Sequence, residues 1–128
     1  MGFSAHLYVK LQPIWRKNIT HPFVQELGKG TLDIEKFRFY MIQDYLYLID
    51  YAKLFAMGAI KADSVKTMAK FAALLDSTNE EMSLHRVYAS RFGISPEELE
   101  QAERSSITLA YTHSVSYTHL TLPTNREV

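Results

Sequence analysis

The fold of this chain is decided by residues 35–59, EKFRFYMIQDYLYLIDYAKLFAMGA. The spacing of these residues predicts a helix whose circumference is apolar or aromatic almost all round, whereas a helix at a protein surface carries one apolar stripe. A helix of this kind is surrounded by other helices. Asp33 precedes the segment and can cap the exposed amide groups of its first turn. The segment therefore predicts the central helix of an all-α protein.

Helix signals also precede this segment. Residues 3–17 predict a helix with one buried apolar stripe at helical spacing, made of Leu7, Leu11, Ile14 and Trp15. A short amphipathic helix over 23–27 follows a turn enforced by His21 and Pro22 and ends in a glycine-rich stop at 28–30.

Three more helices are predicted after the central one. Asp63 or Ser64 caps a helix over about 65–91, which ends at Gly93. Its inward-facing candidates are Met68, Phe71, Leu75, Met82 and Tyr88. The stretch SPEE at 95–98 has the serine, proline and glutamate of a capping box, and starts a short helix ending near residue 103. A further helix begins near 105 or 106.

Composition narrows the class of protein. The 128 residues suit one domain, and 47% of them are hydrophobic, which is typical of a globular protein. Fourteen basic side chains balance fourteen acidic ones, so the net charge favours neither nucleic acid nor an acidic membrane surface as a partner. No cysteine occurs, which excludes a thiol nucleophile and thiolate metal ligands from this stretch and fits a reducing cytoplasm. Charged residues interrupt the most apolar segment, so no membrane span is expected.

The last residues differ in character from the rest. Residues 116–128, SYTHLTLPTNREV, are rich in threonine, contain a proline and lack helical periodicity. We expect either a frayed terminus or a native chain that stops inside a helix and continues in unrelated sequence. The predicted domains are accordingly 1–115 and a separate tail, 116–128.

Asp44 is the strongest candidate for a functional residue. Aspartate has poor helix propensity, and Asp44 has no capping task because it lies in mid-helix. Tyr40, Tyr47 and Tyr51 lie four residues before, three after and seven after it, on the same face. A carboxylate ringed by phenols suits a flat, nitrogen-rich ligand. A purely structural role, in which Asp44 pairs with an Arg or Lys of another helix or with tyrosine hydroxyls, remains open.

Glu81 and His85 are a second candidate pair. Four residues apart, they share a helix face and can in principle bind a metal or act as an acid and base. The di-iron bundle signature spaces Glu and His three apart and repeats on a second helix, and neither condition is met. A hydrogen-bonded, structural His85 is the favoured interpretation, as is a structural His21. The sequence predicts no metal site.

The ordered motifs resemble the TenA/thiaminase II family. The match includes HPFVQELGKGTLDIEKFRFYMIQDYLYLIDYAKLFAMGA at 21–59, the Gln43-Asp44-xx-Tyr47-Leu48 core, EMSLHR at 81–86 and Ala110-Tyr111-Thr112. It covers about 3–115, and the tail does not resemble the family. The resemblance implies an all-helical, haem-oxygenase-like bundle without haem or other cofactor, commonly a homotetramer in the cytoplasm.

The resemblance also implies an activity. Family members hydrolyse aminopyrimidines in thiamin salvage, and some cleave thiamin itself. By position, Asp44 matches the carboxylate that holds the pyrimidine amine and ring nitrogen, Tyr47 an aromatic pocket residue, and Tyr111 a tyrosine whose hydroxyl assists at the reacting end. We predict these three as substrate-binding residues and predict no catalytic residue.

The chain also departs from the family pattern. The family's nucleophilic cysteine lies downstream of Tyr111 and, like its late glutamate, has no counterpart here. We therefore expect an incomplete bundle that is inactive alone and exposes apolar surface. Two alternatives are a PqqC-like or metal-dependent oxidase of the same fold, and a non-catalytic helical module for oligomerisation.

Overall fold

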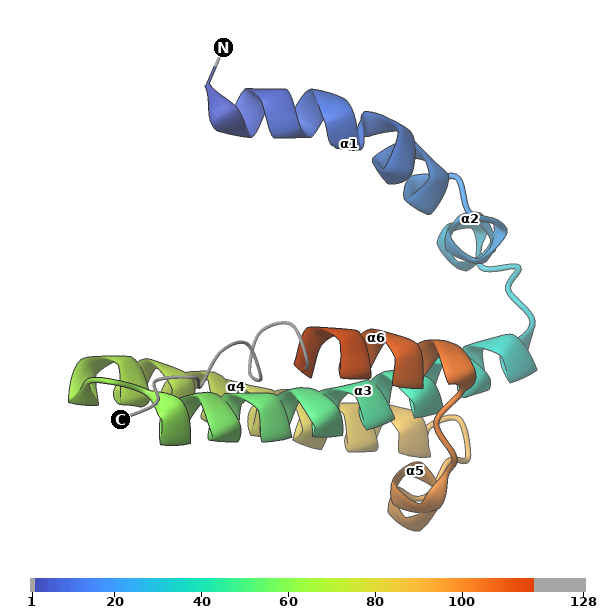
Figure 1. Ribbon diagram of the computed structural model, residues 1–128. Coiled ribbons are helices and arrows are strands. Elements are labelled where there is room, and N and C mark those ends of the chain that lie inside the picture. The colour runs from blue at the N-terminus through green and yellow to red at the C-terminus, as the bar shows by residue number, and fades with distance from the viewer. Residues whose placement is uncertain (1, 117–128) are drawn as a thin grey trace. The chain divides into compact units, whose positions relative to one another are not determined.

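The described part of the chain, residues 2–116 of a computed structural model, consists of helices with no strand (Figure 1). The helices are α1 Phe3–Ile19, α2 Pro22–Lys29, α3 Ile34–Lys61, α4 Val65–Ser90, α5 Pro96–Gln101 and α6 Ser106–Ser116. The predicted all-α class is confirmed. Most of the predicted tail, from residue 117, lies outside the described residues. The chain divides into two units, Met1–Phe37 and Arg38–Val128.

The first unit contains α1 and α2. His21 is structural, as expected, because its Nδ1 accepts a hydrogen bond from the Phe23 amide at 3.2 Å at the start of α2. Gly30 ends α2 in the left-handed conformation, with φ of 70°, which glycine adopts without strain. The stripe predicted to be buried on α1 is exposed, since no residue of α1 is buried. Within this unit, α1 has only the eight-residue α2 as a neighbour, and a helix that short cannot cover a stripe four turns long.

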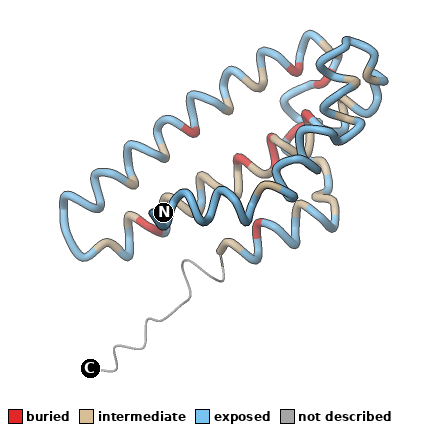
Figure 2. The backbone as a smooth tube through the Cα atoms, turned by 90° about the horizontal axis from the view of Figure 1, so that it is seen from above, coloured by how far each residue is buried: buried red, intermediate tan, exposed pale blue. Residues whose placement is uncertain are grey.

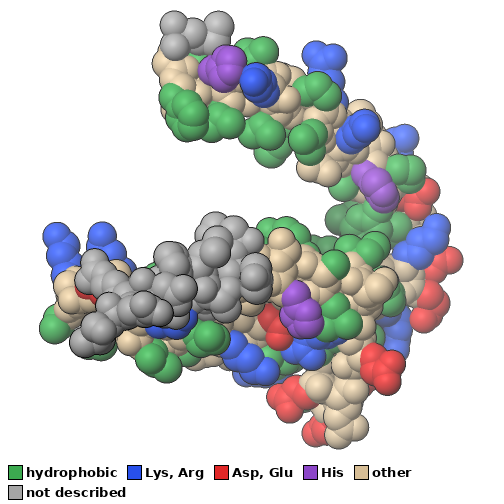
Figure 3. Space-filling view, in the orientation of Figure 1, with side chains coloured by type: hydrophobic (Ala, Val, Ile, Leu, Met, Phe, Trp, Pro, Cys, Tyr) green, Lys and Arg blue, Asp and Glu red, His purple; other side chains and the backbone are tan. Residues whose placement is uncertain are grey.

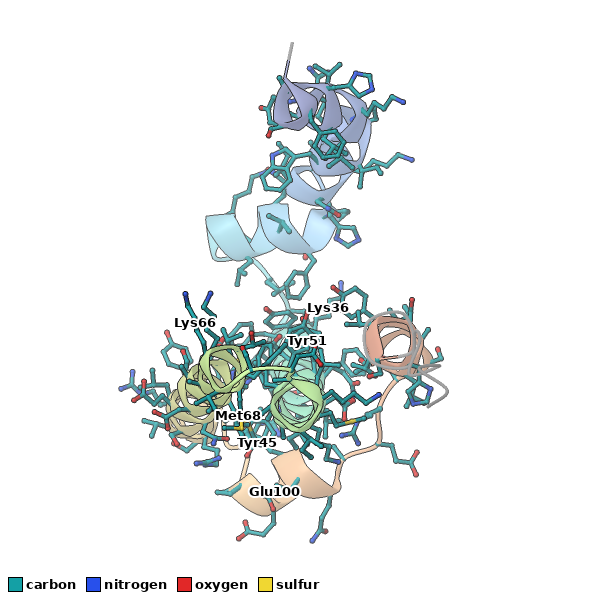
Figure 4. All side chains as sticks on the ribbon, turned by 60° about the vertical axis from the view of Figure 1, so that its left-hand side comes forward. Lys36, Tyr45, Tyr51, Lys66, Met68 and Glu100 are labelled. Carbon is teal, nitrogen blue, oxygen red and sulfur yellow. The ribbon has the colours of Figure 1, made fainter. Side chains whose placement is uncertain are left out.

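The second unit is built around α3. Figures 1 and 4 both show α4 and α6 along opposite sides of α3, with the short α5 crossing near one end. A β-carbon at Gly58 would lie 2.6 Å from the ring of Phe71, so α3 and α4 approach each other at a point where only glycine fits. The prediction of a central helix is confirmed.

The predicted helix starts are also confirmed. Asp33 Oδ1 accepts a hydrogen bond from the Glu35 amide at 2.7 Å. Of the two candidates for capping α4, Ser64 does so, accepting from the Thr67 amide at 3.1 Å. The α5 cap forms at the serine of the SPEE motif, and α6 is capped in the same way by the serine that precedes it. Each cap satisfies amide groups that have no partner inside the helix.

Buried side chains gather where the first half of α3 meets the end of α4 and α5 (Figure 2). They include Met41, Tyr45, Leu46 and Leu48 of α3, Ala89 of α4, Ile94, and Leu99 of α5. α4 faces this core along one stripe, in which every residue is buried or half-buried: Phe71, Leu75, Thr78, Met82, His85 and Ala89.

The prediction that Met68 and Tyr88 of α4 face the core is wrong. Met68 is 45% exposed and Tyr88 is 52% exposed. Tyr88 lies off the packed stripe, where its ring sits under the Arg91 guanidinium at 5.5 Å. Met68 lies near the start of α4 (Figure 4), and nearly half of its surface is exposed.

Large apolar side chains are visible between charged ones on the surface of the second unit (Figure 3). Val65, Leu84 and Val87 of α4 and Ile107 of α6 are more than half exposed. The expectation of exposed apolar surface is confirmed for this unit. None of the helices in the described residues is long and apolar enough to cross a membrane.

Candidate functional site

Asp44 lies on α3 opposite His85 of α4. Its Oδ2 is 3.8 Å from His85 Nδ1, a distance typical of an ion pair and too long for a hydrogen bond. The other ring nitrogen, Nε2, lies 2.9 Å from the Met41 carbonyl oxygen. A carbonyl only accepts, so Nε2 carries a proton, and it is the other nitrogen, Nδ1, that faces Asp44. His85 is thus the hydrogen-bonded, structural histidine that the sequence favoured, and it also orients toward the candidate carboxylate.

Burial raises the pKa of the Asp44 carboxyl above its ordinary value, because its charged form loses contact with water. Glu81 on α4 raises the pKa further by charge repulsion, and His85 opposes the shift. Asp44 in turn acts on Tyr40. Burial first, and then the charge of Asp44, raise the pKa of the Tyr40 hydroxyl. The four groups form one electrostatically linked cluster.

This raised pKa predicts a pH-dependent stability. A carboxyl that binds its proton more tightly in the folded state favours folding while protonated, and this advantage is lost as pH rises from about 3.8 through the raised pKa. We expect Asp44→Asn, which cannot ionise, to gain stability relative to the unmodified chain between about pH 4 and neutrality. Urea unfolding of both proteins across this range measures the difference. A difference that is constant with pH would show that Asp44 is not perturbed.

A second aspartate on α3 shows what a purely structural role looks like. Asp50 accepts two hydrogen bonds from the Arg104 guanidinium, at 2.8 and 2.9 Å. Such bidentate pairing holds a carboxylate firmly and neutralises it. The sequence left open that an arginine of another segment pairs with Asp44. In the structure, such a pair forms at Asp50 instead. Among residues 2–116, the basic group found near the Asp44 carboxylate is His85, at 3.8 Å, and no arginine or lysine pairs with it.

The three predicted substrate-binding residues are brought into one region, but not all into contact. The Tyr47 ring lies 4.6 Å from that of Tyr51 and 5.7 Å from that of Tyr111, between ring centroids. Burial, then hydrogen bonding to Tyr51 and the influence of Tyr111, raise the pKa of the Tyr47 hydroxyl. Asp44 lies one turn before Tyr47 on α3. The rings of Tyr47, Tyr51 and Tyr111 thus form one cluster, which begins one turn along α3 from Asp44.

Gln43 was part of the matched motif, but no role was assigned to it from the sequence. Its Oε1 accepts hydrogen bonds from the Ser105 amide at 2.8 Å and the Thr108 hydroxyl at 2.9 Å. Its Nε2 donates to the Glu103 carbonyl at 2.9 Å. The partners are about sixty residues away in the chain, so no local pattern identifies them.

A cavity of about 350 Å³ lies between α3 and α6. It is found farther along α3 than Asp44, beyond Tyr47. Its walls mix apolar and charged side chains: Asp50, Lys53, Leu54, Met57, Arg104, Leu109, Thr112, His113 and Ser116. In residues 2–116, no three His, Asp or Glu side chains gather as metal ligands would.

Comparison with known proteins shows which family this chain is similar to. The model of the TENA/THI-4/PQQC family matches residues 8–119. The chain is 58% identical over 113 residues to an aminopyrimidine aminohydrolase of Halalkalibacterium halodurans, covering 88% of this chain and 50% of that protein. It is 46% identical over 113 residues to an aminopyrimidine aminohydrolase of Helicobacter pylori, covering 88% and 52%.

A solved structure agrees with these matches. A TenA family transcription regulator from a Silicibacter species superposes with a TM-score of 0.75 at 32% identity, over 87% of this chain and 50% of that one. The chain thus spans about half the length of the relatives it matches. The TenA-type fold expected from the resemblance is confirmed. With a family match that covers most of its length and relatives of this identity, the chain belongs to the TENA/THI-4/PQQC family.

Proposed function

We propose that this chain carries the ring-binding part of an aminopyrimidine hydrolase of thiamin metabolism. The observation that carries the proposal is the setting of Asp44, whose carboxyl is half-buried, lies 3.8 Å from His85 and is close enough to Tyr40 to raise the pKa of its hydroxyl. The names of the relatives point the same way, since two of the most similar are aminopyrimidine aminohydrolases. These names favour hydrolysis over oxidase chemistry within the same family.

The chemistry of the ligand fits this carboxyl. The amine of an aminopyrimidine donates a hydrogen bond to one carboxyl oxygen. The adjacent ring nitrogen and the second oxygen are both acceptors when neither is protonated, so a proton must lie between them. Burial raises the pKa of Asp44 and so makes that proton easier to hold. The faces of Tyr47 and Tyr111 would then stack on the ring.

The chain supplies binding groups more clearly than catalytic ones. It contains no cysteine, so a thiol nucleophile cannot come from these 128 residues. We therefore propose that the chain by itself binds an aminopyrimidine without turning it over. A cytoplasmic location and assembly into homo-oligomers belong to the same proposal, as does thiamin as an alternative ligand, because it carries the same ring.

A thermal-shift titration tests the proposal. A ligand that binds only the folded form at about one hundred times its Kd stabilises it by about 2.7 kcal/mol. We expect 4-aminopyrimidine to raise the Tm in a concentration-dependent way and pyrimidine, which lacks the amine, to have little effect. Equal effects of both compounds, or none from either, would contradict a site that recognises the amine. Ammonia release measured in parallel should stay at the background rate.

A further inference from the structure

Three side chains at helical spacing on α3 face α6 and the connection before it. Gln43 hydrogen-bonds to residues 103, 105 and 108, the Tyr47 ring contacts the Tyr111 ring, and Asp50 pairs with Arg104. Positions 43, 47 and 50 repeat every three or four residues, so they form one stripe. Tyr47, the middle residue, is the only one of the three also placed in the candidate site. The stripe therefore links the site to the placement of α6.

Gln43 uses both the oxygen and the nitrogen of its carboxamide in this contact. The Thr108 hydroxyl has a single proton and donates it to Gln43 Oε1 at 2.9 Å. The Ser105 hydroxyl, 2.9 Å from Thr108 Oγ1, must then donate to Thr108 while accepting from the Thr108 amide. The directions of the hydrogen bonds at the start of α6 are thus fixed. Ser105 donates to Thr108, Thr108 donates to Gln43, and Gln43 Oε1 is the final acceptor. We call Gln43, Ser105 and Thr108 the α6 clamp.

The α6 clamp lies one helical turn before Tyr111, the tyrosine whose position it affects. Tyr111 follows Thr108 by three residues, so both side chains lie on the same side of α6. Tyr111 itself is 53% exposed, and burial alone does little to hold its ring. A rotation or slide of α6 at Thr108 would move that ring away from Tyr47. The position of Tyr111 therefore depends on the hydrogen bonds at the start of its helix.

We propose that Gln43 is a positioning residue, which sets Tyr111 against Tyr47 by clamping the start of α6 to α3. The proposal rests on the proposed function insofar as these tyrosines contact an aminopyrimidine. Its structural half, the dependence of the Tyr47–Tyr111 contact on Gln43, stands without any ligand. Gln43 would not touch the ligand itself.

Gln43→Met tests the clamp, because methionine has a similar shape and makes none of the three hydrogen bonds. The first measurement is the NOE between the ring protons of Tyr47 and Tyr111, assigned with the single Tyr→Phe variants. We expect it to weaken severalfold. The second is the Kd for 4-aminopyrimidine, which should rise about tenfold as one stacking wall is lost. Thr108→Val removes the two hydrogen bonds of the Thr108 hydroxyl, to Gln43 and to Ser105, but leaves the bonds of Gln43 to the Ser105 amide and the Glu103 carbonyl. It should weaken both readouts in part, and serves if Gln43→Met does not fold.

Arg38→Met is the matched control. Arg38 also lies on α3 and donates to a distant backbone carbonyl, that of Phe92, and its guanidinium pairs with Glu98 of α5 at 3.8 Å. Its loss should lower stability while the NOE is kept and the Kd stays within about twofold. An unchanged NOE in both clamp variants, or equal losses in Arg38→Met, would overturn the proposal. If the unmodified chain binds no aminopyrimidine, the proposed function fails, and the NOE alone decides the clamp.

Discussion

Replacing Asp44 by alanine should raise the Kd for 4-aminopyrimidine by about a hundredfold. Hydrogen bonds to a charged group contribute about 1.5–3 kcal/mol each, and a hundredfold change corresponds to about 2.7 kcal/mol. The loss should fall on binding and not on folding, because alanine is the better helix former and Asp44 carries a burial penalty. Titration followed by NMR, with urea unfolding of the same samples, measures both.

Two further variants test whether the loss of affinity is specific to the Asp44 side chain. Asp76→Ala removes an exposed aspartate of α4 and should leave the Kd unchanged. Asp44→Asn keeps an acceptor and a donor in one plane, which is how an amide pairs with the adjacent amine and ring nitrogen of adenine. We expect it to lose less than tenfold in affinity and to lose any pH dependence that comes from position 44. Full binding by Asp44→Ala would remove Asp44 from the site.

Leu46→Ala should lower the free energy of unfolding by about 3 kcal/mol. Leu46 is completely buried on α3. Truncating a leucine in such a place costs about 2–5 kcal/mol, because its transfer energy is lost and a cavity remains. A loss of 1 kcal/mol lowers the Tm by about 4–8 °C in a domain of about 60–100 residues and by about 2–4 °C in one of about 150–250 residues. Urea unfolding monitored by circular dichroism gives the change in free energy.

Leu84→Ala makes the same chemical change on the surface. Leu84 of α4 is 71% exposed, and its truncation should alter stability by no more than about 0.5 kcal/mol. Comparable losses in the two variants would mean that Leu84 is buried in solution by association with another molecule. A loss of stability in Leu84→Ala that depends on protein concentration would support the proposed oligomer.

The helices were predictable because their signals are local. Asp33, Ser64 and Ser95 cap the amide groups two or three residues ahead of them, and Gly30 and Gly93 adopt positive φ angles at helix ends. Such signals depend on neighbours within one turn and survive any arrangement of the helices. Burial was less predictable. The α1 stripe and Met68 have the spacing of core residues, yet they are exposed because the elements of their own units cover them only in part.

The candidate site was predictable in its residues and not in its connections. Asp44 stood out because a carboxylate in an apolar helix is costly without a partner. Its partner, His85, is 41 residues away, and the sequence had paired that histidine with Glu81. Gln43 gave no signal at all, since a glutamine in mid-helix is ordinary unless its partners are known.

The sequence by itself determined the all-α class, the helix boundaries to within a few residues, the family, and Asp44, Tyr47 and Tyr111 as candidates. The tertiary structure decided that arginine neutralises Asp50 and not Asp44, that His85 faces Asp44 through Nδ1, and that Gln43 holds the start of α6. The physical reason is the sequence separation over which each interaction acts. Helix propensity and capping act within a turn, whereas charge pairing, burial and side-chain hydrogen bonds join residues that only packing of the helices brings together.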